Sequence, residues 1–413
     1  MHTIKKILFP FILVLWGFQF GFTQNQSNSP YTRYGYGELS HSVPIELKGM
    51  GGVSIGNRSK NIINGINPAS YTSVDSMTFM FDIAANGRIS RFSDELNSHQ
   101  TFNSNLEYLR LRFPLKKWLA VSVGLEPYSF AGYQYHQKDS IKVLQNNGTN
   151  KNLYYLEHFQ GTGGLSQIYT GVSLKLFNHI ALGVNAYYLF GELNNKRTLS
   201  FINSTNNPTS YSNKIVANDF RLRYGTQYFH SFGKHNVILG AIYEPKKKLD
   251  GSFSELKDNQ EVETNSNFEL PETIGVGLNY TFNNQFTLGI DYMKQGWKDI
   301  NYFGKKDTLY STNQFALGME YIPNLKGRKY LERVRYRAGI KTNNQYYKIQ
   351  DKSSSQNYTF SLGAGFPIFT GRSILNVAIE YGKIGNNSLL REDFIQISFS
   401  ASINEYWFFK PKL

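Results

Sequence analysis

The chain has 413 residues, no cysteine and a formal net charge of +14. An exported chain without cysteine has neither disulfides nor a lipid-modified cysteine, so its stability must come from the fold itself. Only 40% of residues are hydrophobic, yet 15% are aromatic. This mixture suits neither a helical membrane protein nor a large soluble enzyme. It is typical of a transmembrane β-barrel, in which only every second strand residue must be apolar.

The basic residues are scattered, with local groups at 246–248 and 326–337. No helix or recognition motif carries them, so we expect no nucleic-acid partner. Phosphate-rich lipopolysaccharide and lipid of an outer membrane would suit an exported basic chain. Solvated loops and turns are the alternative explanation of the same residues.

The first 23 residues have the pattern of a secretory signal peptide. Lys5 and Lys6 precede an apolar run over 7–22, which Pro10 and Gly17 interrupt. The run is short for a membrane-spanning helix, which needs about 20 apolar residues. We therefore predict a cleaved signal peptide over 1–23, with an uncleaved anchor as the alternative.

Residues 24–75 lack the alternation of a strand. They contain an aromatic, glycine-rich run at 31–37 and a glycine cluster at 49–52, and they end near an Asn-Pro-Ala sequence at 67–69. We predict short helices near 45–48 and 61–64. The segment is expected to fold into the mouth or lumen of a barrel formed by residues 76–413.

From Met77 onward, apolar residues recur at every second position. In 286–292, for example, Phe, Leu, Ile and Tyr alternate with Thr, Gly and Asp. Such alternation predicts strands with one large apolar face and one small or polar face. The predicted spans are 76–93, 100–113, 118–137, 163–177, 179–202, 213–231, 236–254, 262–283, 285–300, 308–322, 332–349, 355–367, 372–384 and 391–409.

This pattern favours an all-β fold, a transmembrane antiparallel barrel of about 14 strands with an N-terminal hatch. A soluble β-sandwich is the alternative, but its outer face would be mostly charged rather than rich in Gly, Ser and Asn. The phrases VGLNY, LGIDY and LGMEY place small residues inside and an aromatic outward.

The connections alternate between short and long, as expected when both termini are periplasmic. Residues 138–162 are a predicted long loop, in which a strand at 152–160 could be hidden. Residues 323–332 are an unusually long connection on the periplasmic side.

The sequence resembles the FadL-like outer-membrane barrels in its leader, its GMGGVSIG run, its Asn-Pro-Ala sequence before the first strand and its strand number. The resemblance implies that the residues before the first strand form a hatch inside the lumen, and that transporting members pass hydrophobic ligands. The residues that match hatch positions are Gly49, Gly51, Gly52, Asn67, Pro68 and Ala69.

The chemistry of these residues fits a hatch without the resemblance. Glycine permits positive φ and close backbone approach, where a chain passes between barrel walls. Pro68 biases Asn67 toward extended geometry, and the Asn67 side chain can bond its own local backbone. The alternative is an ordinary turn into the first strand. Whether the segment is a gate that moves or a fixed plug stays open.

Six charged residues fall on the polar face of the predicted strands. They either line a selective lumen or pair across it to hold the barrel together, and pairing is favoured because lumen charges need partners. The six are Glu107, Arg110, Arg112, Asp291, Glu320 and Glu380.

The aromatic C-terminal strand resembles the signal read by the outer-membrane assembly machinery. The matching residues are Tyr406, Trp407, Phe408 and Phe409, although four further residues follow them.

No enzyme signature is present. The eight histidines have no metal-ligand spacing, and the glycine clusters lack the context of a phosphate loop. We expect no catalytic residue, metal or cofactor. Two functions remain: passive transport of hydrophobic small molecules, or a non-transporting accessory role in a larger outer-membrane secretion or assembly complex.

Overall fold

The computed structural model describes most of the chain beyond the predicted signal peptide. The described residues are 27–75, 77–94, 97–144, 148–202, 207–257, 260–264, 268–302, 306, 309–348, 356–368, 372–386 and 390–406. The predicted signal peptide at 1–23 lies outside them.

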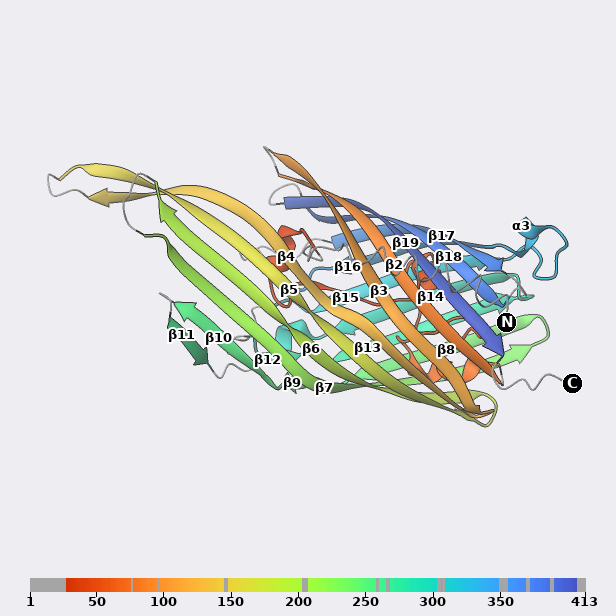
Figure 1. The fold of residues 1–413 in the computed structure, drawn as a ribbon. Helices are drawn as coiled ribbons and strands as arrows, with labels where there is room; N and C mark the ends of the chain where they lie inside the picture. The colour runs from red at the N-terminus through yellow and green to blue at the C-terminus, as the bar shows by residue number, and fades with distance from the viewer. Residues whose placement is uncertain are drawn as a thin grey trace, which may run out of the picture.

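Fourteen strands within the described residues form a closed antiparallel barrel (Figure 1). Each strand pairs with its neighbour, β8 pairs with β13, and β19 pairs with β2 to close the ring. The predicted barrel is therefore confirmed. The strands are β2 (Thr78–Ser93), β3 (Ser98–Lys116), β4 (Leu119–Leu144), β5 (Asn150–Leu176), β6 (Ile180–Phe201), β7 (Thr209–Phe232), β8 (His235–Glu244), β13 (Thr273–Phe282), β14 (Phe286–Gln295), β15 (Thr312–Tyr321), β16 (Arg335–Asn344), β17 (Gln356–Ile368), β18 (Ser373–Asn386) and β19 (Leu390–Tyr406).

The two faces of the wall differ as the alternation predicts. On β19 the apolar side chains of Ile395, Ile397 and Phe399 are exposed outside, whereas Ser398 and Ser400 are buried inside. An exposed apolar outer face is the face that contacts lipid in a transmembrane barrel.

The wall is much taller on one side than on the other. β4 and β5 have 26 and 27 residues, whereas β13, β14, β15 and β16 have 10 each. The predicted loop at 138–162 is wrong: residues 138–144 and 150–162 continue β4 and β5 as a paired ribbon that projects from one end of the barrel (Figure 1). Residues 152–160 belong to β5, so they add no strand to the count.

The predicted strands at 236–254 and 262–283 are each interrupted. β8 ends before Pro245 and β13 begins after Pro271, because proline removes a ladder donor. Between them, β9 (Lys247–Leu249) pairs with β12 (Phe268–Leu270) as a separate small sheet. β10 (Gly251–Lys257) pairs with β7 and with β11 (Gln260–Thr264), so this hairpin extends the tall side.

The barrel has a turn end and a loop end. At the turn end, the connections 117–118, 177–179, 233–234 and 283–285 are two or three residues long, and 322–334 is the long one. It contains α3 (Tyr330–Arg333). The loop end carries the long connections, including η4 (Trp297–Asp299).

Residues 27–75, called the N-terminal segment below, run inside the barrel. They contain η2 (Pro30–Arg33), β1 (Glu38–Leu39), α2 (Ile45–Lys48) and η3 (Pro68–Ser73). β1 pairs with β4 on the tall side. The helix predicted near 61–64 is wrong, because the Asn64 side chain instead donates to the carbonyls of Ser54 and Asn57 and fixes a loop.

Candidate functional site

The N-terminal segment meets the wall through a belt of glycines. Nine neighbouring strands, from β5 round to β17, each place one glycine against the segment or against a side chain that it contacts. Cross-strand pairing holds several of them level, as with Gly183 and Gly225, or Gly318 and Gly339. The described glycines of this belt are Gly171, Gly183, Gly225, Gly240, Gly277, Gly289, Gly318, Gly339 and Gly363.

The belt allows main chain to lie directly on main chain. A Cβ added at Gly339 would clash with the backbone of Met50 and Gly51, and one added at Gly183 would clash with the backbone of Pro68 and Ala69. Any wall side chain larger than hydrogen would therefore displace the segment. At this height no space is left between segment and wall along the belt.

The glycine cluster of the segment lies opposite the short side of the barrel. A Cβ added at Gly49 would come within 2.9 Å of the Gly363 Cα. Gly51 and Gly52 have φ values of 69° and 85°, a region that favours glycine. The amide of Gly51 also donates to the Ser361 hydroxyl over 2.8 Å. These residues turn the segment from α2 onto the glycine belt.

The Asn-Pro-Ala sequence starts η3 against β6 and β7. Asn67 is extended, with φ −116°, and its side-chain oxygen accepts from the Ala69 amide over 3.1 Å. Its side-chain amide donates to the carbonyls of Ile55 and Thr226, at 2.8 and 3.2 Å. Asn67 thus caps η3, ties two parts of the segment together and anchors both to the wall.

Four of the six charged residues predicted to face the lumen hold the segment directly. The Asp291 carboxylate accepts from the amides of Ser54 and Ile55 over 2.6 and 2.8 Å. Glu107 forms an ion pair with Lys48 of α2 at 2.5 Å. The other two are arginines of β3.

The arginines of β3 reach across to backbone carbonyls of the segment. Arg110 pairs with Glu126 at 2.6 Å and donates to the carbonyls of Ser42 and Ile63. Arg112 donates to the carbonyls of Ser59 and Lys60. Both side chains are fully buried, so each needs these partners to offset its desolvation.

Glu320 and Glu380 bond within the wall instead. Glu320 pairs with Arg337 at 2.7 Å, and Glu380 accepts from Gln396 over 3.3 Å. The six residues are therefore all on the inner face, but they form separate contacts rather than one ligand site.

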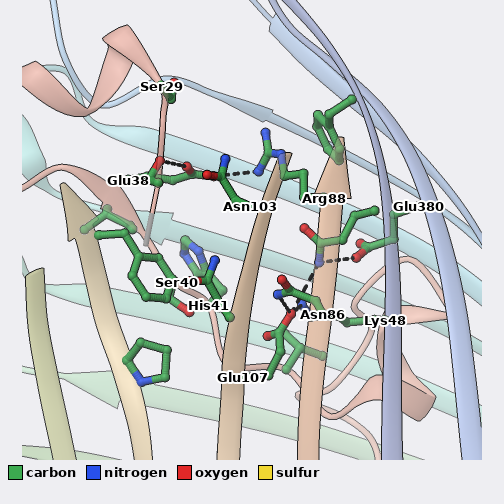
Figure 2. Close-up of a pocket in the computed structure, with 18 of the residues that line it drawn as sticks. Ser29, Glu38, Ser40, His41, Lys48, Asn86, Arg88, Asn103, Glu107 and Glu380 are labelled. Atoms are coloured by element: carbon green, nitrogen blue, oxygen red, sulfur yellow. Dashed lines mark hydrogen bonds and ion pairs between the residues drawn. The ribbon is translucent and has the colours of Figure 1, made fainter. Parts of the chain in front are cut away.

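A polar cavity of about 160 Å³ lies between the segment and strands β2, β3, β18 and β19 (Figure 2). Arg88 of β2 bridges Glu38 and Glu392, at 2.6 Å to each. Lys48, Glu107 and Glu380 line the same space. This lining suits water or a polar solute rather than a hydrocarbon, because uncompensated burial of charge is costly.

An aromatic cluster covers the loop end of the lumen. Tyr34 stacks on Tyr347 at 5.5 Å, and Tyr36 meets Tyr302 edge-on at 5.2 Å. The Tyr36 hydroxyl donates to the Glu269 carbonyl over 3.0 Å, and burial raises the pKa of Tyr36 well above its usual range, so it stays a donor. The members are Tyr31, Tyr34, Tyr36, Trp297, Tyr302, Tyr346 and Tyr347.

Sequence reasoning missed this cluster as a functional element. The aromatic, glycine-rich run at 31–37 was its visible signal. The partners at 297, 302 and 346–347 lie in loops, where no periodicity marks a buried side chain.

Of the predicted assembly signal, only Tyr406 is described. It ends β19, pairs with Thr78 and is 50% exposed. Trp407, Phe408 and Phe409 lie outside the described residues.

A family model supplies the identification. The BamG model matches residues 3–413, nearly the whole chain. The chain belongs to the BamG family. No curated protein is similar enough in sequence to count as a match to this BamG-family chain.

Solved structures with this fold include outer-membrane transporters. The toluene transporter TbuX of Ralstonia pickettii has 13% identity and a TM-score of 0.57, over 87% of this chain and 97% of its own. The toluene transporter TodX of Pseudomonas putida has 13% identity and a TM-score of 0.56, over 93% and 100%. A FadL homologue of Pseudomonas aeruginosa has 12% identity and a TM-score of 0.53, over 87% and 98%.

These comparisons confirm the predicted resemblance. The BamG-family chain is an outer-membrane barrel with the FadL-type fold. The similarity to these transporters establishes the fold of the chain, and a fold does not by itself determine a function.

Neither a helical span nor a metal centre emerges from the described part of the chain. No helix there is long and apolar enough to cross a membrane. No three His, Asp or Glu residues there are grouped to hold a metal ion.

Proposed function

We propose that this barrel is a non-transporting accessory subunit of the outer-membrane β-barrel assembly machinery, with the N-terminal segment as a fixed plug. The BamG family name points to association with that machinery. The observation that carries the non-transporting role is the close seating of the N-terminal segment against the glycine belt, where main chain lies on main chain. An accessory subunit needs a stable barrel that presents surfaces, and it has no need of a path through the barrel.

The lumen is occupied at three levels. The aromatic cluster covers the loop end, buried arginines and carboxylates hold the middle of the segment, and the glycine belt seats its main chain. A moving gate would have to break contacts at all three levels together. Breaking a buried ion pair of this kind costs about 3–5 kcal/mol.

The test of the accessory role is co-purification. The full-length barrel is tagged at a surface loop and extracted from native outer membranes in mild detergent, and its size and partners are measured. We expect a large species that contains the assembly machinery. A lone species of monomer size would contradict the accessory role.

Passive transport of hydrophobic small molecules is the second candidate, favoured by a specific cavity. A space of about 190 Å³ beside the aromatic cluster is lined in part by Met293, Tyr346, Tyr347, Ile384 and Phe394. The toluene transporters with the same fold make this the natural alternative. Uptake of toluene by proteoliposomes that contain the purified barrel would support transport.

We also propose lipopolysaccharide as the lipid partner of the loop end. In barrels of this class the short turns are periplasmic and the long connections extracellular. The projecting β4–β5 ribbon carries exposed Lys138, Lys142 and Lys151, which suit phosphate groups. Replacing these three with glutamate should reduce lipopolysaccharide co-purification, and unchanged retention would contradict the contact.

A further inference from the structure

The long connection at the turn end, residues 322–334, is unlike the other described turns there. Thirteen residues separate β15 from β16, whereas four other turns have two or three. In Figure 1 this turn and α3 reach past the neighbouring strand ends on the right of the view. The lumen contacts described above do not involve it, so neither the plug nor the barrel closure explains its length.

The turn has a defined structure rather than the character of a loose linker. The Asn324 amide donates to the Glu332 carbonyl over 2.8 Å, and the Gly327 amide donates to the Asn324 carbonyl over 3.0 Å. The Tyr330 hydroxyl donates to the Pro367 carbonyl over 3.2 Å, which ties the turn to the end of β17. Ile322 and Val334 are buried at its base. The turn therefore presents its remaining side chains in a fixed arrangement.

Those side chains are mostly basic and apolar, and Glu332 is the one carboxylate of the turn. Lys326, Arg328 and Lys329 are exposed, and none of them has a carboxylate within ion-pair distance among the described residues. The lumen differs, since Arg88, Arg110 and Arg337 there are each paired with a glutamate. Unpaired cations on a fixed turn are available for an external anionic group.

Apolar side chains flank these cations. Leu325 is 53% exposed, Tyr330 45% and Leu331 67%. All three belong to the turn, which reaches past the ends of the neighbouring strands (Figure 1). Exposed leucines beside unpaired cations are typical of a protein docking surface, with an apolar centre and a charged rim.

We infer that residues 323–333 are a docking surface for an acidic, partly apolar face of a periplasmic subunit of the assembly machinery. The inference rests on the proposed accessory function and specifies the side of the membrane on which contact is made. The three cations steer and orient the acidic partner, while Leu325, Tyr330 and Leu331 are buried against it. Complementary charges of this kind make association dependent on ionic strength.

The test reverses the three charges in the full-length barrel. The variant Lys326→Glu, Arg328→Glu and Lys329→Glu is compared with a matched control, Lys116→Glu, Lys117→Glu and Lys234→Glu. The control makes the same charge change at exposed lysines of the same end. We expect the first variant to lose at least about tenfold in recovery of the periplasmic subunit, and the control to match the native chain. Raising the salt concentration should weaken recovery by the native chain.

A photoreactive residue tests direct contact. Placed at Leu331, it should cross-link to the periplasmic subunit, whereas at Leu115, a turn-end position that is 56% exposed, it should not. If the native chain and the triple variant recover the machinery equally, the docking surface is wrong and the accessory role stands. If the native chain recovers no machinery, both proposals fail. Cross-linking only to phospholipid at Leu331 would overturn the protein partner in favour of an anionic lipid.

Discussion

The β3 wall and the glycine belt hold the same segment by different means. Strand β3 sends the long side chains of Arg110 and Arg112 to backbone carbonyls of the segment. The belt instead offers glycines of tall and short strands alike, such as Gly183 of β6 and Gly339 of β16, and the main chain of the segment lies directly on them. The polar cavity lies on the β3 side and is lined mainly by residues of β2, β3, β18 and β19.

The difference shows how a short N-terminal segment can be held inside a lumen. Contact with glycine lets the two backbones pack closely but hardly fixes the orientation of the segment. A buried arginine fixes that orientation, because its guanidinium donates several hydrogen bonds in a rigid geometry. Together they determine both where the segment lies and how it is oriented. Substitutions at the β3 arginines and in the glycine belt should therefore destabilise the segment to different extents.

The largest effect is expected at the arginines of β3. Arg110→Met would leave Glu126 buried without its cation and would free the carbonyls of Ser42 and Ile63. Breaking one partner of a buried pair costs about 3–5 kcal/mol. The measurement is the temperature at which the folded barrel loses its fast gel migration. Arg91→Met, at an exposed position of β2, is the control and should leave that temperature unchanged. Equal melting of both variants would count against the Arg110 anchor.

A smaller effect is expected in the glycine belt. Gly339→Ala would push a methyl group into the backbone of Met50 and Gly51, and overpacking of this kind costs about 1–3 kcal/mol. Limited proteolysis of the segment should speed up. Gly87→Ala is the control, since its nearest neighbour is the flexible ring of exposed Phe102. A stabilised Gly339→Ala variant would refute the close contact.

The smallest effect is expected at Asn67, whose side chain bonds to Ile55 and Ala69 of the same segment. Asn67→Ala removes the cap of η3 and the bond to the Ile55 carbonyl, at a cost of about 1–2 kcal/mol. Hydrogen exchange over 67–73 should accelerate while the barrel strands stay protected. Asn28→Ala, at an exposed bond to Asn103, should change neither. If exchange in 67–73 stays slow, the cap is not what orders η3.

The number of strands and the side chains that face lipid were predictable, because apolar and polar residues alternate along each strand. The glycines of VGLNY, LGIDY and LGMEY, namely Gly277, Gly289 and Gly318, were assigned to the inside on that basis. What they accommodate was not predictable, since glycine in a strand shows only that a side chain is absent. The contact to Ile55, Val53 or Met50 depends on how the segment folds back through the lumen.

Strand height was predicted poorly for a related reason. Residues 138–144 and 150–162 carry polar and charged side chains on both faces because the projecting ribbon meets water on both faces. Period-two alternation vanishes in such a ribbon, and the sequence resembles a loop. The aromatic cluster was missed because its members are far apart in the sequence and come together only in the folded barrel.

The most direct test of the fixed plug is a tether between segment and wall. The hydroxyls of Thr72 in η3 and Ser173 in β5 lie 3.4 Å apart, and the native chain has no cysteine to compete. Thr72→Cys with Ser173→Cys should therefore form one defined disulfide, with each single variant as control. The account predicts that growth, outer-membrane protein assembly and uptake of a hydrophobic probe are the same in the oxidised and the reduced form. A loss of any of these on oxidation that a reductant restores would show that the segment moves as a gate, and would contradict the fixed plug.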